Sequence, residues 1–381
     1  MDTQTPTVAK DVATVYASIE LSRKSWQVAV QSAGQGRASR HKLSAGDEAG
    51  LWRVLEREQA RLERSSGGRA RVVTCYEAGR DGFWLHRALE SHGAESHVVD
   101  PASIEVNRRA RRAKSDKLDV DGLLRALISY EAGERHRCRM VAVPSVAEED
   151  ARRPGRERQR LVKERVAQSN RISGLLATQG IYGYRPQHAD RWDRLAELRC
   201  ADGRALPELL HEEVVRALTR LEFVQRQIKA VEKQRAGKLA DEDRGARYTR
   251  ALMRFYGIGI EIASTLAREV YYRDFANRRQ VGSYVGLAGS PYQSGERNHE
   301  QGISKAGNRL ARHKAIELAW LWLQHQPQSA LSRWFYARLG TSQSKRFKRV
   351  LAVALARKLV VALWRYLTAG VVPEGARLAP C

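Results

Sequence analysis

The sequence has 381 residues, of which 43% are hydrophobic and 29% charged, a balance typical of a globular protein with two or three domains. Its 67 Lys and Arg outweigh 43 Asp and Glu, so the net charge is +24. An excess of this size, in which Arg is more frequent than Lys, predicts a nucleic-acid partner rather than a basic surface that is merely solvated. The four cysteines are too widely spaced for a zinc ribbon or a disulfide framework.

Compartment and membrane contact follow from the same composition. The polar residues 1–11 lack the pattern of a signal peptide, and three cations interrupt the most apolar helix candidate, 350–367. We therefore expect a cytoplasmic protein without a membrane span.

Residues 12–145 alternate between strand and helix patterns and are expected to form one α/β domain. The predicted elements are strands at 15–21 and 26–30 around a turn at 22–24, a helix at 47–63, a strand at 71–76, a helix at 82–92, a short strand at 97–99 and a helix at 116–130. A strand hairpin followed by alternating strands and helices predicts a mixed sheet flanked by helices.

Residues 146–245 are helical in pattern and highly charged, with an Arg-rich run at 151–171 that Pro154 interrupts. Within 206–238, apolar residues recur every three or four positions, at Leu210, Val214, Leu218, Leu221, Val224, Ile228 and Val231. This seam predicts a helical hairpin or a coiled coil with a partner. An amphipathic helix packed on its own domain fits the same spacing, so the sequence leaves both possibilities open.

Residues 246–370 are expected to form a compact, mostly helical domain. Its Gly257-Ile258-Gly259 turn before a helix resembles a helix–hairpin–helix element, whose backbone N–H groups bind DNA phosphate, although a plain loop has the same sequence. Residues 302–308 predict a turn before a helix, or a phosphate contact that includes Lys305. Residues 345–349 predict a nucleic-acid patch, and we assign Trp320, Trp322, Trp334 and Trp364 to the core rather than to base stacking.

Four carboxylates in the first domain form a candidate metal site. Glu20 lies near the end of the first apolar strand, Glu77 follows the other strongly apolar strand, and Asp116 and Asp119 are three residues apart on the next helix. Acids at two strand ends are expected at one edge of a sheet, and converging carboxylates bind the Mg²⁺ used in nucleic-acid chemistry. Asp116 also fits an ordinary acid in the first turn of a helix.

A nucleophile is harder to select from the residues alone. No phosphate-binding loop of the G-x-x-x-x-G-K-[ST] type is present, so no nucleotide triphosphatase is expected, and a nucleophile would be a hydroxyl or similar group close to a phosphate-binding surface. Ser283, Ser290, Ser294 and Ser304 are nearly equal candidates, since serines in such segments often only stabilise turns.

The order of motifs resembles transposases of the insertion-sequence family 110. The matching segments are 76–82, 111–116, 257–259, 284–287, 293–295 and 302–308, and the first two are closest to the 1111 branch. The resemblance extends from about residue 14 to about residue 367. It implies a RuvC-type ribonuclease-H domain at 12–145, a helical coiled-coil segment at 146–245 and a helical transposase domain at 246–370.

The same resemblance implies an RNA-guided recombinase that cuts and rejoins DNA. Ser294 would be the catalytic serine, and Glu20, Glu77, Asp116 and Asp119 would be the Mg²⁺ ligands. The implied partners are donor and target DNA, a non-coding guide RNA and further copies of the chain in a dimer or tetramer, in a prokaryotic cytoplasm near the nucleoid. The residues expected to bind nucleic acid are Arg111, Arg112, Lys114, Gly257, Gly259, Arg297, Lys305 and Arg309.

One position departs from the family pattern, because Glu20 stands where Asp is usual. The extra methylene moves the carboxylate oxygens by about one bond length, which matters to a cation as demanding as Mg²⁺. Two alternatives therefore stay open: a RuvC-like junction nuclease that uses water as its attacker, and a nucleic-acid-binding protein without catalysis.

Overall fold

The computed structural model describes residues 13–34, 36–79, 81–104, 116–294 and 297–379, and of residues 102, 116–118, 290–294 and 297–301 it describes the backbone alone. The chain divides into two compact units, Met1–Val143 and Pro144–Cys381, and each is considered by itself. Among the described residues, no helix is long and apolar enough to cross a membrane.

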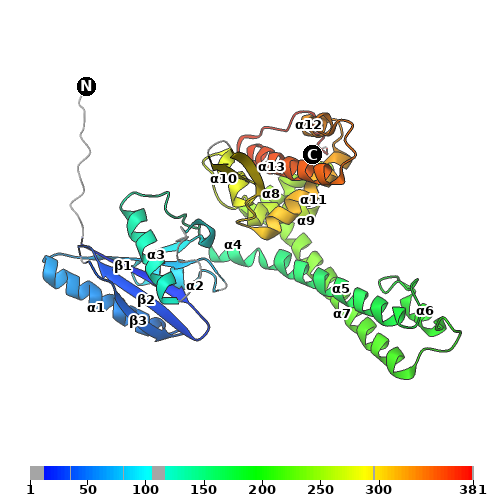
Figure 1. Ribbon diagram of the computed structural model, residues 1–381, viewed down its shortest axis with the longest axis horizontal. Coiled ribbons are helices and arrows are strands. Elements are labelled where there is room, and N and C mark those ends of the chain that lie inside the picture. The colour runs from blue at the N-terminus through cyan, green and yellow to red at the C-terminus, as the bar shows by residue number, and fades with distance from the viewer. Residues whose placement is uncertain (1–12, 35, 80, 105–115, 295–296, 380–381) are drawn as a thin grey trace. The chain divides into compact units, whose positions relative to one another are not determined.

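The first unit is a mixed five-stranded sheet with helices on both faces (Figure 1). Its elements are β1 (Thr14–Leu21), β2 (Ser25–Ser32), β3 (Ser39–Ser44), α1 (Glu48–Ser66), β4 (Arg71–Glu77), α2 (Trp84–Ser91), β5 (Glu95–Val99), the short η1 (Pro101–Ser103) and α3 (Asp116–Glu131). The strand order is β3-β2-β1-β4-β5, in which β1, β2 and β3 are antiparallel and β1, β4 and β5 are parallel. The α/β prediction is confirmed, but β3 was not predicted from the sequence.

Alternating side chains divide the sheet between two cores. Val15, Ala17 and Ile19 of β1 point to the core shared with α1 and α2, as do Val72 and Tyr76 of β4. The other face lies under α3, where the Ser18 hydroxyl donates a hydrogen bond to the Val120 carbonyl at 2.7 Å. Cys75 is buried beside Leu123 on this same face. The even-numbered residues of β1 and the odd-numbered residues of β4 therefore face α3.

The second unit is mostly helical. Its elements are α4 (Val146–Asp150), α5 (Arg153–Ala177), α6 (Arg191–Glu197), α7 (Glu208–Gly237), the short η3 (Lys238–Ala240), α8 (Arg244–Met253), α9 (Ile260–Glu269), α10 (Arg278–Tyr284), β6 (Gly289–Ser294), β7 (Arg297–Ile303), α11 (Arg309–His325), α12 (Ala330–Leu339) and α13 (Lys345–Ala369).

The predicted apolar seam forms a helical hairpin within the chain, because α5 and α7 pack side by side (Figure 1). Val214, Leu218 and Leu221 of α7 are fully buried and share a core with Ile172 and Leu176 of α5. The interruption predicted at Pro154 lies at the start of α5: α4 ends at Asp150, and the proline is in the first turn of α5, where its missing N–H costs nothing.

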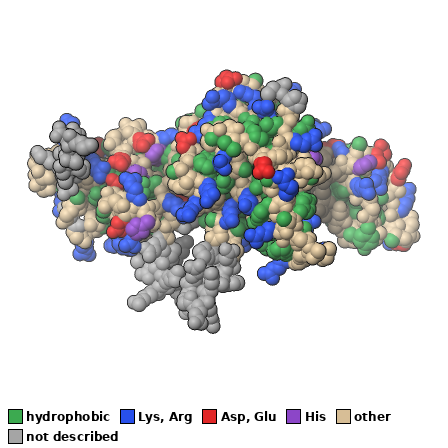
Figure 2. Space-filling view, turned by 90° about the horizontal axis from the view of Figure 1, so that it is seen from above, with side chains coloured by type: hydrophobic (Ala, Val, Ile, Leu, Met, Phe, Trp, Pro, Cys, Tyr) green, Lys and Arg blue, Asp and Glu red, His purple; other side chains and the backbone are tan. Residues whose placement is uncertain are grey.

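The helical body formed by α8 to α13 has its own core, with Trp322, Phe255 and Phe335 fully buried. The two-stranded hairpin β6–β7 is an addition to the predicted helical domain. Its polar sequences lack the apolar alternation by which strands are usually found. On the face shown in Figure 2, Lys and Arg side chains are more widespread than acidic ones and lie among hydrophobic groups.

Candidate catalytic and nucleic-acid-binding sites

Glu20 and Glu77 lie at one edge of the sheet and on one of its faces. The parallel register of β1 and β4 runs to the pair Ile19 and Tyr76, and the two glutamates are the next residues on their strands. Each is two residues beyond a residue that contacts α3, Ser18 in β1 and Cys75 in β4, so both glutamates occupy the face that α3 covers. Both are partly buried.

Helix α3 runs back over this face in the direction opposite to β1. Val120 lies over Ser18, while Glu131, at the other end of α3, contacts Arg71 at the start of β4. The first turn of α3 is therefore at the same end of the sheet as Glu20 and Glu77. Asp119, which is partly buried, immediately precedes Val120, and Asp116 is the first residue of the helix. The side chain of Asp116 lies outside the described part.

The register thus gathers the predicted acids at one end of the sheet without closing them into a tight cluster. Among the described side chains, only one group of acids and histidines has its potential ligand atoms all within 4.8 Å of one another, and it does not include Glu20, Glu77 or Asp119. A donor set made of carboxylates alone has the chemistry that suits a hard cation such as Mg²⁺.

The tighter group, Glu95, His97 and Glu131, lies at the opposite end of the sheet, where β4 and β5 begin. Arg71 already contacts both carboxylates, at 3.2 Å from Glu95 and 2.9 Å from Glu131. This group is therefore an ion-pair network that joins β4, β5 and the end of α3, and the sequence analysis did not select it.

Ser294 is the last residue of β6, and the antiparallel register places it directly opposite Arg297, the first residue of β7. No strand was predicted here from the sequence, so the position of Ser294 in a strand is new. The backbone hydrogen bonds of a hairpin fix such a position more closely than a loop does. Ser290 lies in the same strand, whereas Ser283 lies in α10 and Ser304 follows β7.

Two glycines hold the base of this hairpin to the helical body. Gly286 has φ of +70°, and a Cβ there would lie 1.9 Å from the Ala306 carbonyl oxygen. Gly307 has φ of +82°, and a Cβ there would lie 2.1 Å from the Tyr284 carbonyl oxygen. Only glycine combines these backbone angles with so close an approach of main chain to main chain. Segments 284–287 and 302–308 are thereby fixed against each other.

Hydrogen bonds complete this base. The Lys305 N–H donates to the Gly286 carbonyl at 3.2 Å, and the Asn308 N–H donates to Tyr284 at 3.2 Å. Asn308 also caps α11, because its Oδ1 accepts from the Ala311 N–H at 3.0 Å. Residues 304–308 connect β7 to α11, so part of the predicted turn before a helix is present, but Gly302 and Ile303 are the last residues of β7.

Several predicted nucleic-acid contacts lie in this domain. Lys305 and Arg309 are exposed at the base of the hairpin. Burial, together with the charge of Arg309, lowers the pKa of the neighbouring Arg312. Gly257 lies in the turn between α8 and α9, and Gly259 caps α9 without a side chain, so two helices do flank this turn. The side chain of Arg297 is not described, and Arg111, Arg112 and Lys114 lie outside the described residues.

Comparison with known proteins identifies the family. The model for the transposase family IS116/IS110/IS902 matches residues 249–334. The protein named "Putative transposase y4rJ" of Sinorhizobium fredii is 47% identical over 98% of this chain and 97% of its own length. The chain belongs to the IS116/IS110/IS902 transposase family.

Two more distant relatives agree with this assignment and with the 1111 branch. The transposase for insertion sequence element IS1111A of Coxiella burnetii is 26% identical over 78% of this chain and 77% of its own length. The transposase for IS1328 of Yersinia enterocolitica is 26% identical over 79% of this chain and 85% of its own length. The segment matched by the transposase family model includes the turn at Gly257, the β6–β7 hairpin and its base.

One residue of this transposase that sequence reasoning missed is Glu269, at the end of α9. It is only 3% exposed and accepts two hydrogen bonds from Arg156 of α5, at 2.7 and 3.0 Å. The Asn308 side chain donates a third, at 2.8 Å. The Glu269 carboxylate raises the pKa of Arg156, against the effect of burial. Glu269 thus connects the α5–α7 hairpin to the base of the β6–β7 hairpin, which we call the serine hairpin. No spacing in the sequence indicates this connection.

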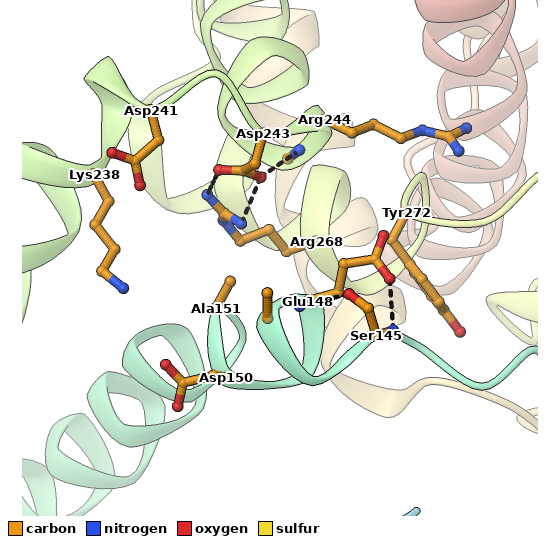
Figure 3. A pocket seen from close by; sticks show the side chains of 12 residues that line it. Ser145, Glu148, Asp150, Ala151, Lys238, Asp241, Asp243, Arg244, Arg268 and Tyr272 are labelled. Carbon is orange, nitrogen blue, oxygen red and sulfur yellow. Dashed lines mark hydrogen bonds and ion pairs between the residues drawn. The ribbon is translucent and has the colours of Figure 1, made fainter. Parts of the chain in front are cut away.

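The second unit also has a pocket of about 520 Å³ that includes several charged residues in its lining (Figure 3). Asp243 caps α8 and accepts two hydrogen bonds from Arg268, at 3.0 and 3.1 Å. Burial alone would raise the pKa of Asp243, but the hydrogen bonds from Arg268 and from backbone N–H groups lower it overall. Ser145 and Glu148 form a capping box on another wall. None of the predicted catalytic residues is among the residues that line this pocket.

Proposed function

We propose that this transposase is an RNA-guided DNA recombinase that cuts and rejoins DNA through a covalent bond to Ser294. The observation that carries the proposal is the place of Ser294 at the end of β6, opposite Arg297, on a hairpin whose base is locked by Gly286 and Gly307. A nucleophile must be held within contact distance of the phosphate that it attacks, and a strand end with a fixed base is suited to that task.

In the proposed step, the Ser294 hydroxyl oxygen attacks the scissile phosphorus and forms a new P–O bond. The P–O bond to the leaving strand breaks, the serine proton goes to solvent, and the leaving oxygen takes up a proton. One phosphodiester is exchanged for another, so no external energy source is needed to rejoin the strands. Lys305 and Arg309, which are exposed at the hairpin base, would neutralise the charge of the phosphates beside the reaction.

The carboxylates of the first unit would hold Mg²⁺. Glu20, Glu77 and Asp119 supply oxygen ligands, with Asp116 as the fourth proposed member. The bound ion would stabilise negative charge on the oxygens of the reacting phosphodiester. Strand order, strand directions and helices on both faces support the classification of this unit as a ribonuclease-H-like domain.

The charge of +24 supports two kinds of nucleic-acid partner, a DNA that is cut and a guide RNA that selects it by base pairing. The proposed assembly is a homodimer or tetramer, in which the acids of one copy complete a site with the serine of another.

The test is trapping of the covalent intermediate. Full-length protein is incubated with end-labelled cognate DNA, guide RNA and Mg²⁺, and a labelled species that migrates with the protein in denaturing gels is quantified. We expect Ser294→Ala to abolish this species and lower strand transfer by at least about a thousandfold. Ser290→Ala, in the same strand, is the matched control and should retain both.

Two outcomes would overturn the proposal in different ways. Continued Mg²⁺-dependent cutting by the Ser294→Ala variant, without an adduct, would assign the protein to the RuvC-like nucleases that use water. Binding of DNA and RNA without any cleavage by the unmodified protein would leave a nucleic-acid-binding role alone.

A further inference from the structure

The start of α13 is unusual, because six consecutive helical residues, Lys345 to Val350, are all exposed. Four of them are cations: Lys345, Arg346, Lys348 and Arg349. Among the described residues, none of these four has a carboxylate within ion-pair distance, whereas most arginines of α5 and α9 have one. Positive charge at the start of a helix is also opposed by the helix dipole. The fold therefore holds four unneutralised cations where they cost stability.

Aromatic side chains lie beside these cations. Trp320 of α11 is 37% exposed, so its assignment to the core was wrong, whereas that of Trp322, fully buried, is confirmed. Lys348 lies over the Trp320 ring at 5.8 Å. Phe347 in α13 and Tyr336 in α12 are exposed as well, at 38% and 51%.

Two of the exposed rings, those of Trp320 and Tyr336, are held in place by contact with the buried core. The ring of Trp320 packs edge-on against the fully buried Phe335, with 6.4 Å between the ring centroids. Phe335 also contacts Tyr336, with 5.4 Å between their ring centroids. Rings that are fixed by the core lose little conformational freedom when a flat ligand stacks on them. Lys348 contacts Trp320, Tyr336 is joined to Trp320 through Phe335, and the first two turns of α13 supply the neighbouring exposed residues. We call this region the α11–α12–α13 surface; its residues are Trp320, Tyr336, Lys345, Arg346, Phe347, Lys348 and Arg349.

The surrounding charge indicates an anionic occupant. Residues 301–381 contain 14 Lys and Arg but only two acidic residues, Glu317 and Glu374, so this fifth of the chain contributes +12, half of the total net charge of +24. An acidic protein would satisfy the cations, but it would not account for several exposed rings. A nucleic-acid duplex presents phosphates, but its bases are stacked on one another and are not available to the rings.

We infer that the α11–α12–α13 surface binds an unpaired nucleic-acid strand, with phosphates on the four cations and bases stacked on the aromatic rings. This combination of basic residues and stacking platforms is the general means by which proteins hold single strands. The surface includes neither Ser294 nor the acids Glu20, Glu77 and Asp119 at the end of the sheet, which we call the acidic edge. It therefore adds a strand-holding function to the proposed recombinase. The strand is either the unpaired part of an RNA or a DNA strand separated from its complement.

The test is equilibrium binding of the full-length protein to fluorescent 12-nucleotide strands, measured by anisotropy without divalent metal so that cleavage does not contribute. The strands are a DNA, an RNA of the same sequence, a DNA duplex, and a DNA with abasic positions that keeps the phosphates but lacks bases. We expect Phe347→Ala to weaken binding of the intact single strands about tenfold and to leave binding of the abasic strand and the duplex unchanged.

The charge contribution is tested by replacing Lys345, Arg346, Lys348 and Arg349 together with Gln. The slope of log K against log salt for the single strand should fall by about 3, since each phosphate contact contributes about 0.7. The matched control replaces four exposed cations of α7, Arg220, Arg226, Lys229 and Lys233, and its aromatic counterpart is Phe223→Ala, at a ring that is 55% exposed.

Equal losses in the α13 and α7 variants would overturn the inference, since they would show a response to total charge. Equal binding of the intact and abasic strands by the unmodified protein would overturn it too, because stacking would then contribute nothing. A tighter complex with RNA or with DNA identifies which strand the surface holds. The replaced side chains are exposed, so circular dichroism should show unchanged folding.

Discussion

The acidic edge of the first unit and the serine hairpin of the second position their chemical groups by different means. Glu20, Glu77 and Asp119 project from regular strands and a helix, whose register alone sets their places. Ser294 lies on a short hairpin of mostly polar sequence, and the base of this hairpin is held by two glycines and a network of hydrogen bonds.

This difference determines where each site is vulnerable. Replacing Glu20 or Glu77 removes a proposed ligand, and we expect the sheet to stay folded because its main apolar core, shared with α1 and α2, lies on the opposite face and does not include these acids. A substitution at the base of the β6–β7 hairpin, by contrast, should move Ser294 although Ser294 itself is unchanged. The structure therefore predicts that distant substitutions will impair the serine site more than the acidic site.

The largest effect on stability is expected from Gly286→Ala. The new Cβ would overlap the Ala306 carbonyl oxygen and would also require a left-handed backbone, so the free energy of unfolding of the second unit should fall by about 4 kcal/mol. Urea denaturation followed by tryptophan fluorescence measures this change.

Gly302→Ala is the matched control, since Gly302 has φ of +89° in the same hairpin but open space around a Cβ. It carries only the conformational cost, about 1 kcal/mol. If the two variants lost equal stability, the close approach of main chain at Gly286 would not be what locks the hairpin.

The same contrast explains what the sequence could reveal. The acids were found because strands and helices have fixed periods, so apolar runs located β1, β4 and α3 and thereby their ends. The β6–β7 hairpin was missed because its strands contain Pro291 and polar residues, and because its position depends on distant main-chain contacts. β3 was missed for a related reason: it is an edge strand in which Leu43 is the only apolar residue and half-buried positions alternate with exposed ones.

The role of Glu269 could not be predicted from the sequence. Its role depends on Arg156 and Asn308, which are 113 and 39 residues away along the chain. An acid in the last turn of an amphipathic helix normally indicates an exposed position. Only the packing of α5 and of the hairpin base around α9 buries this one.

A smaller effect is expected from Glu269→Ala, about 2 kcal/mol of unfolding free energy. The partly buried Asn308 side chain would lose its acceptor, while Arg156, whose side chain is 56% exposed, could recover hydration. Strand transfer should fall more than stability accounts for, because the base of the serine hairpin is loosened.

Asp274→Ala provides the control, because Asp274 forms an equally short ion pair with Arg244, at 2.6 Å, but is 90% exposed. Exposed pairs contribute little, so this variant should change stability by less than about 0.5 kcal/mol and leave strand transfer intact. If Glu269→Ala behaved in the same way, the buried network would have no part in placing the hairpin.

The smallest effect, and a gain, is expected from Glu20→Asp. β1 is paired on both sides, and its register with β2 and β4 continues without a bulge up to this point, so the backbone does not compensate for the longer side chain. The shorter Asp should bring the carboxylate closer to the position usual in the family. The Mg²⁺ concentration that gives half-maximal strand cleavage should then decrease severalfold, by less than about tenfold. Glu95→Asp, in the ion-pair network at the other end of the sheet, should leave it unchanged. A higher Mg²⁺ requirement for Glu20→Asp would mean that the other ligands have adapted to the longer side chain, and the acidic edge would then depend on its surroundings as much as the serine hairpin does.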